Sequence, residues 1–165
     1  HFGGKEGLYA VVVDRELRAL TDAVTASLTA GGSDRETIER AALALLDYIE
    51  DSPDGFRILV RDVSGTAPSG TYASLLSDVA AEVADVLSDA FEQRELESRY
   101  APMYAQMLVG MVALTGQWWL EERRPRREEV AANLVNLGWN GLAHLEAKPK
   151  LVTRTPKQQS KQAKP

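Results

Sequence analysis

Residues 1–9, HFGGKEGLY, contain a break in regular structure and the start of the first long helix of the chain. Gly3 and Gly4 supply the permissive backbone that a tight turn needs. A long amphipathic run begins directly after them, at Lys5. We therefore predict that residues 1–4 form a junction, with a helix from Lys5 on one side and a further segment preceding His1 on the other.

Beyond this junction, apolar residues recur every three or four positions, which is the periodicity of amphipathic helices. The predicted helices cover residues 5–29, about 34–51, a short stretch starting at Ser52-Pro53, then roughly 71–94, 102–121 and 126–145. Gly31-Gly32 end the first helix, and Ser33 with Glu36 forms a capping box for the second. No segment alternates apolar and polar residues. The sequence predicts an all-α, antiparallel bundle of about six helices.

The helix predicted over 102–121 carries apolar residues on two opposite sides. One side holds Met103, Met107, Gly110, Met111, Leu114 and Trp118, and the other holds Ala105, Val109, Val112, Ala113, Gly116 and Leu120. Such a helix has to be covered on both sides. We expect the core of the domain to cover one side and a second subunit to cover the other.

The last predicted helix has two glycines on its apolar stripe, although glycine costs roughly 1 kcal/mol in a helix interior. Small residues allow another helix to approach closely. We therefore predict a homodimer formed by the last two helices. Its interface is expected to contain Ala105, Val109, Ala113, Gly116, Leu134, Gly138, Gly141 and Leu142.

The charge is distributed unevenly along the chain. Residues 1–147 carry 13 basic and 24 acidic side chains, whereas residues 148–165 carry six basic residues and no acidic ones. An acidic body does not bind nucleic acid by itself. We predict an effector-binding and dimerisation domain over 5–147 and a disordered basic tail over 148–165, which either solubilises the protein or adds affinity for DNA phosphates.

Several classes of protein are disfavoured by composition. No apolar run approaches the length of about 18 residues that a membrane span needs. The chain has no cysteine, which suits a cytoplasmic protein. Its two histidines lie at opposite ends, and its glycine pairs lack the context of a phosphate loop. We predict no enzyme activity, no cofactor and no metal.

Two groups of residues resemble TetR-family transcriptional regulators. His1, Phe2, Lys5 and Leu8 match the family's junction between its DNA-binding head and its body. Trp118-Trp119-Leu120-Glu121, a loop with Pro125, and Gly138-Trp139-Asn140-Gly141-Leu142 are similar to its last two helices. The resemblance implies a helix-turn-helix head before His1 and a four-helix dimer bundle. It also implies that Lys5 contacts a DNA phosphate, and that His1 ends the recognition helix.

The resemblance further implies a ligand pocket in the body. The expected lining is Phe56, Arg57, Tyr72, Leu76, Met103, Tyr104, Met107, Met111 and Trp118, with Arg57 or Tyr104 as a polar anchor. An ordinary core would explain the same methionines and aromatic residues equally well. The expected function is a repressor that binds operator DNA as a homodimer and is released by an apolar small molecule. The alternative is a helical adaptor or scaffold without DNA binding.

Overall fold

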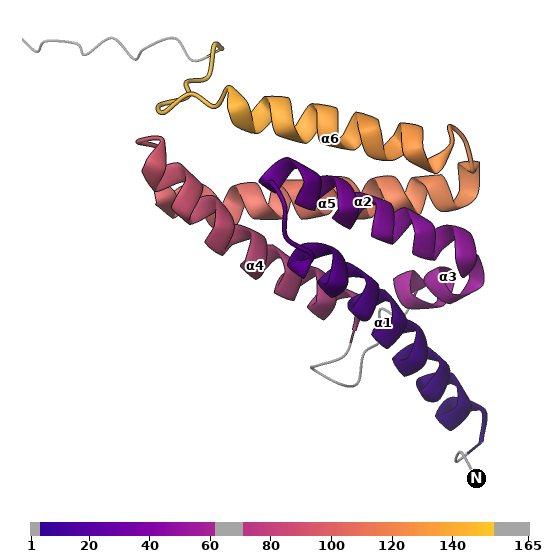
Figure 1. The fold of residues 1–165 in the computed structure, drawn as a ribbon. Coiled ribbons are helices and arrows are strands. Elements are labelled where there is room, and N and C mark those ends of the chain that lie inside the picture. The colour runs from indigo at the N-terminus through magenta and orange to yellow at the C-terminus, as the bar shows by residue number, and fades with distance from the viewer. Residues whose placement is uncertain (1–3, 62–70, 154–165) are drawn as a thin grey trace, which may run out of the picture.

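The computed structural model describes residues 4–61 and 71–153, and these residues confirm the all-α architecture (Figure 1). They contain six α-helices, one 3₁₀ turn and no strand. The elements are α1 (Lys5–Thr29), α2 (Asp34–Asp51), α3 (Pro53–Arg61), α4 (Tyr72–Gln93), η1 (Ser98–Tyr100), α5 (Ala101–Glu122) and α6 (Arg127–Ala143). These bounds lie within about two residues of the predicted ones wherever a range was predicted.

The helix boundaries follow from local chemistry. Gly31 and Gly32 adopt φ values of 75° and 101°, in the left-handed region that glycine enters without steric cost. The Ser33 side chain then accepts a hydrogen bond from the Glu36 backbone, while the Ser33 backbone donates to the Glu36 carboxylate at 2.7 Å. This capping box confirms the predicted start of α2. Thr71 and Ser74 form an equivalent capping box at the start of α4.

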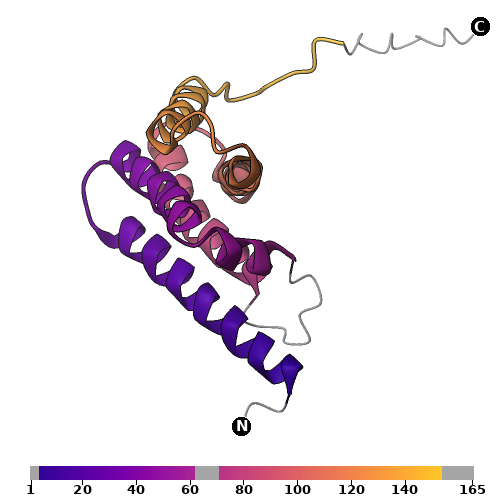
Figure 2. The same ribbon diagram turned by 90° about the vertical axis from the view of Figure 1, so that its right-hand side faces the viewer.

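The helices pack as antiparallel neighbours. Figure 2 shows α1 and α2 as a hairpin along one side of the molecule, with α6 lying against the outer side of α2. The most extensive packing joins α4 to α5, which run antiparallel on either side of η1. In Figure 1, α5 and α6 run side by side along the edge of the bundle.

The core has two parts. The larger joins α1, α2 and α3 to the start of α4, the end of α5 and the start of α6, and Phe56, Leu46 and Ile49 are completely buried in it. The smaller part lies at the opposite end of α4 and α5, around Phe91 and Ala105. None of the helices among the described residues is long and apolar enough to cross a membrane.

Candidate functional site

The two sides of α5 have different environments. Its small residues Ala105, Ala113 and Gly116 face the interior of the protomer. A Cβ atom added to Gly116 would lie 3.0 Å from Ile49 and 3.1 Å from Leu45, both on α2. The absence of a side chain at Gly116 therefore allows α2 to approach α5 closely.

The large residues of α5 lie on the outside. Leu114 is 66% exposed and Trp118 is 50% exposed, and Leu137 of α6 is 66% exposed. Together with Met103 and Met107, they form what we call the outer apolar face. The burial of the small residues within the protomer differs from our expectation, which placed them toward a second subunit. The small residues face inward because they allow the helices of one chain to pack closely.

The remaining residues of the predicted interface are divided. Leu134 is in the core, and Gly138 is buried with Leu108 and Met111 each 3.3 Å from the position of an added Cβ. Val109 and Leu142 are half-buried, and Leu142 packs against the smaller core. Gly141 is exposed, with no atom within 4 Å of its added Cβ. Of the three glycines in the predicted interface, Gly141 is thus the one with open space beside it.

Three of the predicted ligand-binding residues pack within the larger core. Phe56 lies edge-on to Tyr72 with ring centroids 5.6 Å apart, and Leu76 packs against the same cluster. Burial raises the pKa of Tyr72 to about 12, and the nearby Gln117 side chain opposes this shift. No side chain among the described residues meets the Tyr72 hydroxyl with full hydrogen-bond geometry. These residues line neither of the two hollows described below.

The predicted polar anchor Arg57 is held at the surface by carboxylates. It contacts Asp54 at 2.9 Å and Glu121 at 3.2 Å. The hydrogen bond to Glu121, followed by that to Asp54, raises the pKa of its guanidinium. Arg57 therefore joins α3 to the end of α5 in this structure.

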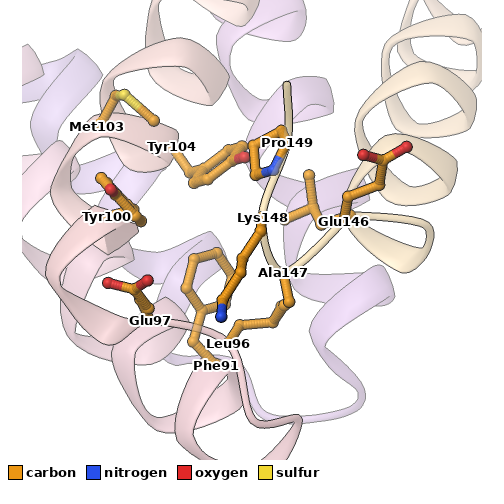
Figure 3. Close-up of a pocket in the computed structure, with 11 residues that line it drawn as sticks. Phe91, Leu96, Glu97, Tyr100, Met103, Tyr104, Glu146, Ala147, Lys148 and Pro149 are labelled. Atoms are coloured by element: carbon orange, nitrogen blue, oxygen red, sulfur yellow. The ribbon is translucent and has the colours of Figure 1, made fainter. Parts of the chain in front are cut away.

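A cavity of about 380 Å³ lies at the smaller core (Figure 3). Its walls come from the end of α4, from η1, from the start of α5 and from the segment after α6. They are formed by Phe91, Leu96, Glu97, Tyr100, Met103, Tyr104, Leu145, Glu146, Ala147, Lys148 and Pro149. The predicted ligand residues Met103 and Tyr104 thus lie here. The volume falls within the range of small-molecule sites, which is about 300–1,000 Å³.

A shallower groove of about 190 Å³ runs between α5 and α6. It contains Tyr104, Met107, Leu108, Met111, Leu137, Gly138, Gly141, Leu142 and Leu145. Tyr104 and Leu145 line both the cavity and the groove, so the two are neighbours. Four predicted ligand residues (Met103, Tyr104, Met107 and Met111) therefore gather around this end of α5, whereas Trp118 lies outside both hollows.

The end of α6, next to the cavity, is held by a residue that the sequence did not indicate. Arg94, at the end of α4, donates hydrogen bonds of 2.9 Å to the carbonyl groups of Leu142 and Ala143. These carbonyls belong to the last turn of α6, where helical partners are lacking. We call residues 144–149 the C-terminal strap. Because Arg94 lies 48 residues from Leu142 in sequence, no local pattern indicates this contact.

Nine of the eleven cavity residues were missed from the sequence, and one of them, Phe91, carries a weak local signal. Phe91 ends the apolar stripe of α4, and its ring meets Tyr104 edge-on at 5.5 Å. Lys5, predicted to contact DNA, is exposed in the first turn of α1, whereas His1 and residues 154–165 of the predicted basic tail lie outside the described residues. The described part of the chain contains no group of three or more residues that could hold a metal ion.

Comparison with known proteins identifies the class of this domain. Residues 23–153 match the family described as "Tetracyclin repressor-like, C-terminal domain". This match covers most of the chain, so the protein belongs to that family, as the junction motif and the last two helices predicted.

A curated relative is the HTH-type transcriptional activator FasR of Mycolicibacterium smegmatis. It is 26% identical to this chain over 147 residues, which are 88% of this chain and 66% of the relative. The chain therefore spans about two thirds of the relative's length.

Proposed function

We propose that this chain is the regulatory body of a transcription regulator that dimerises through its outer apolar face and responds to a small molecule. Membership of the tetracyclin repressor-like family carries this proposal. The relative is named an HTH-type transcriptional activator, which favours a regulator over the alternative of a helical adaptor. That name also favours activation over the repression expected from the sequence.

The outer apolar face supports the proposed dimer. Leu114, Trp118 and Leu137 are each at least half exposed on neighbouring helices, and Gly110 and Gly141 leave room beside them. Large exposed apolar patches are uncommon on monomers and mark interaction sites. A twofold dimer would also suit an operator with two half-sites.

Light scattering tests the dimer at micromolar concentration. We expect twice the chain mass of 18.1 kDa for the wild type and the chain mass itself for Leu114→Glu and Leu137→Glu. Val86→Glu is the matched control, because Val86 is 55% exposed on α4 outside the outer apolar face. A monomeric wild type, or a dimer in both face variants, would contradict the proposal. Gly138→Glu is a poorer test, since buried Gly138 would also disturb the protomer.

The cavity under the C-terminal strap supports a small-molecule effector. Apolar and aromatic walls beside a few polar groups are typical of ligand sites. The lining combines Phe91 and Met103 with the hydroxyl-bearing rings of Tyr100 and Tyr104. We therefore place the proposed effector at this end of α5, and no longer among Phe56, Tyr72 and Leu76.

A thermal-shift screen of apolar metabolites tests this site, because a ligand stabilises the folded state by mass action. We expect a compound that raises the melting temperature of the wild type but not that of Met103→Trp, which would fill the cavity. Trp118→Phe is the control, since Trp118 lines neither hollow. A compound that stabilises both variants equally would place the effector site elsewhere.

Regulation itself requires the whole protein, with the helix-turn-helix segment that we propose before His1. A reporter gene under the promoter of the protein's own operon should change its expression when the whole protein is supplied. Expression that is the same with and without the protein, combined with no retention of that promoter DNA in a gel-shift assay, would favour the adaptor alternative.

A further inference from the structure

A buried carboxylate interrupts the apolar stripe of α1. Glu16 is only 7% exposed and shares the inward side of the helix with Val13, Leu17 and Leu20. Among the described residues, no other charged side chain is buried to this degree. Burying a charge is unfavourable unless hydrogen bonds and opposite charge compensate for it. The buried Glu16 carboxylate therefore needs hydrogen-bond partners in the interior.

The carboxylate joins α1 to the end of α2. Its Oε2 atom accepts hydrogen bonds from the Tyr48 hydroxyl at 2.7 Å and from the Ser52 hydroxyl at 3.0 Å. Arg15, whose side chain is largely exposed, donates to Oε1 at 2.9 Å. The bonds from Arg15 and Tyr48 hold the pKa of Glu16 below its usual value. Burial and the neighbouring carboxylate raise the pKa of Tyr48, which keeps its proton in this hydrogen bond.

The third helix meets the same carboxylate at a glycine. A Cβ atom added to Gly55 would lie 2.3 Å from Oε2 of Glu16 and 2.4 Å from the Ser52 hydroxyl oxygen. Such distances are too short for any side chain, so glycine is the residue that fits here. We call Glu16, Tyr48, Ser52 and Gly55 the Glu16 clamp. It is the point where α1, α2 and α3 converge.

A row of aromatic rings leads from the clamp toward α4. Tyr48 meets Phe56 edge-on with centroids 6.3 Å apart, and Phe56 meets Tyr72 edge-on at 5.6 Å. Tyr72 is the first residue of α4, and Phe91 in the last turn of the same helix lines the cavity. Packed side chains and one helix therefore form a continuous path between the cavity and α1, of the kind that can carry coupling between distant sites.

We propose that Glu16 is a positioning residue: its clamp sets the direction in which α1 leaves the body. Hydrogen bonds are directional, whereas apolar contacts tolerate sliding, so a polar clamp defines an angle that packing alone does not. The exposed residues Leu8, Tyr9 and Val11 near the start of α1 are then presented in one orientation. The inference rests on the proposed function in one respect, namely that α1 leads to a DNA-reading segment.

Distance measurements between spin labels test the clamp directly. The chain contains no cysteine, so Glu6→Cys and Glu122→Cys place labels on exposed positions of α1 and α5 without removing native thiols. Diluting labelled chain with unlabelled chain suppresses distances between subunits. We expect one narrow distance distribution for the labelled chain without further changes. We expect a broad distribution for Tyr48→Phe and for the double variant Glu16→Leu, Tyr48→Phe.

Two comparisons separate positioning from stability. The double variant replaces a buried polar pair by apolar groups, an exchange that often preserves stability, and its melting temperature is measured alongside. Arg18→Gln is the matched control, because largely exposed Arg18 pairs with Asp14 on the same helix, and this variant should retain the narrow distribution. A narrow, unshifted distribution in both Tyr48→Phe and the double variant would overturn the inference. Because the measurement involves neither DNA nor effector, its outcome is independent of the tests of the proposed function.

Discussion

At the scale of single residues, space is especially limited where Gly55 faces Glu16. An added Cβ would be 2.3 Å from the Glu16 carboxylate, and the carboxylate is held by Tyr48 and Ser52. Neither side can move without breaking hydrogen bonds that satisfy a buried charge. The size of the residue at position 55 and the polarity of the residue at position 16 therefore depend on each other.

We expect Gly55→Ala to destabilise the fold by about 1–3 kcal/mol, the usual cost of overpacking. The loss should be much smaller in a chain that already carries Glu16→Ala and Ser52→Ala, because the two nearest oxygen atoms are then gone. Urea unfolding of the single, double and triple variants measures this coupling. Strictly additive losses would show that the glycine and the carboxylate do not constrain each other.

The lowered pKa of Glu16 predicts a pH dependence of stability. The hydrogen bond from Arg15 is its largest cause, followed by that from Tyr48. The folded state thus binds the Glu16 proton less readily than the unfolded state does. The resulting stabilisation is present above the unfolded pKa of about 4.3 and is lost as the pH falls through the folded value.

The wild type should therefore lose more stability on acidification from about pH 6 to about pH 3 than Glu16→Gln, which has no carboxyl to titrate at that position. Chemical unfolding at several pH values measures the difference between the two curves. Parallel curves would show that Glu16 has the same pKa in the folded and unfolded states.

At the scale of elements, α5 determines how the bundle is assembled, because its two sides accept different neighbours. Gly116 lies against Leu45 and Ile49, whereas Gly110 has no atom within 4 Å of its added Cβ. The same residue type therefore serves two purposes on one helix. At Gly116 it permits contact with α2, and at Gly110 it lies beside the open outer face.

Gly116→Val should destabilise the protomer by about 1–3 kcal/mol through overpacking, and Leu45→Ala should partly reverse the loss by making room. Gly110→Val is the matched control on the same helix and should cost less. Both are measured in a Leu114→Glu background, so that subunit association does not enter the comparison. Equal costs at the two positions would contradict the inward orientation of Gly116.

At the scale of the whole molecule, one long-range contact closes the end of the bundle that contains the cavity. Arg94 reaches from the end of α4 to the last turn of α6, from which the C-terminal strap continues over Phe91 and Tyr104. The strap itself makes few polar contacts in the described structure. Its position over the cavity therefore depends on how α6 ends.

Arg94→Gln should speed amide hydrogen exchange in residues 142–149 and at the cavity wall around Phe91, because the guanidinium no longer holds the two carbonyl groups. Mass spectrometry of peptides from the exchanged protein measures this change. Arg99→Gln is the control, since the polar contacts of Arg99 in the described part of the chain are with Glu97 and Tyr100 of its own segment. Unchanged exchange in the strap would show that Arg94 does not fasten it.

The sequence by itself determined the helical class, the number of helices and most helix boundaries, because those depend on local patterns. The Ser33–Glu36 capping box, the Gly31-Gly32 break and the apolar stripe of α1 are all readable within a few residues. The family, too, was indicated by short motifs. The two apolar sides of α5 were likewise evident from periodicity.

Only the tertiary structure decided which side of α5 faces inward, since both sides are equally apolar in sequence. The choice follows from shape: Gly116 and Ala105 allow α2 and α4 to pack closely, which Met107 and Trp118 would prevent. The buried state of Glu16 and the reach of Arg94 were also undetermined by local patterns. Both depend on partners more than 30 residues away, which only the folded chain brings together.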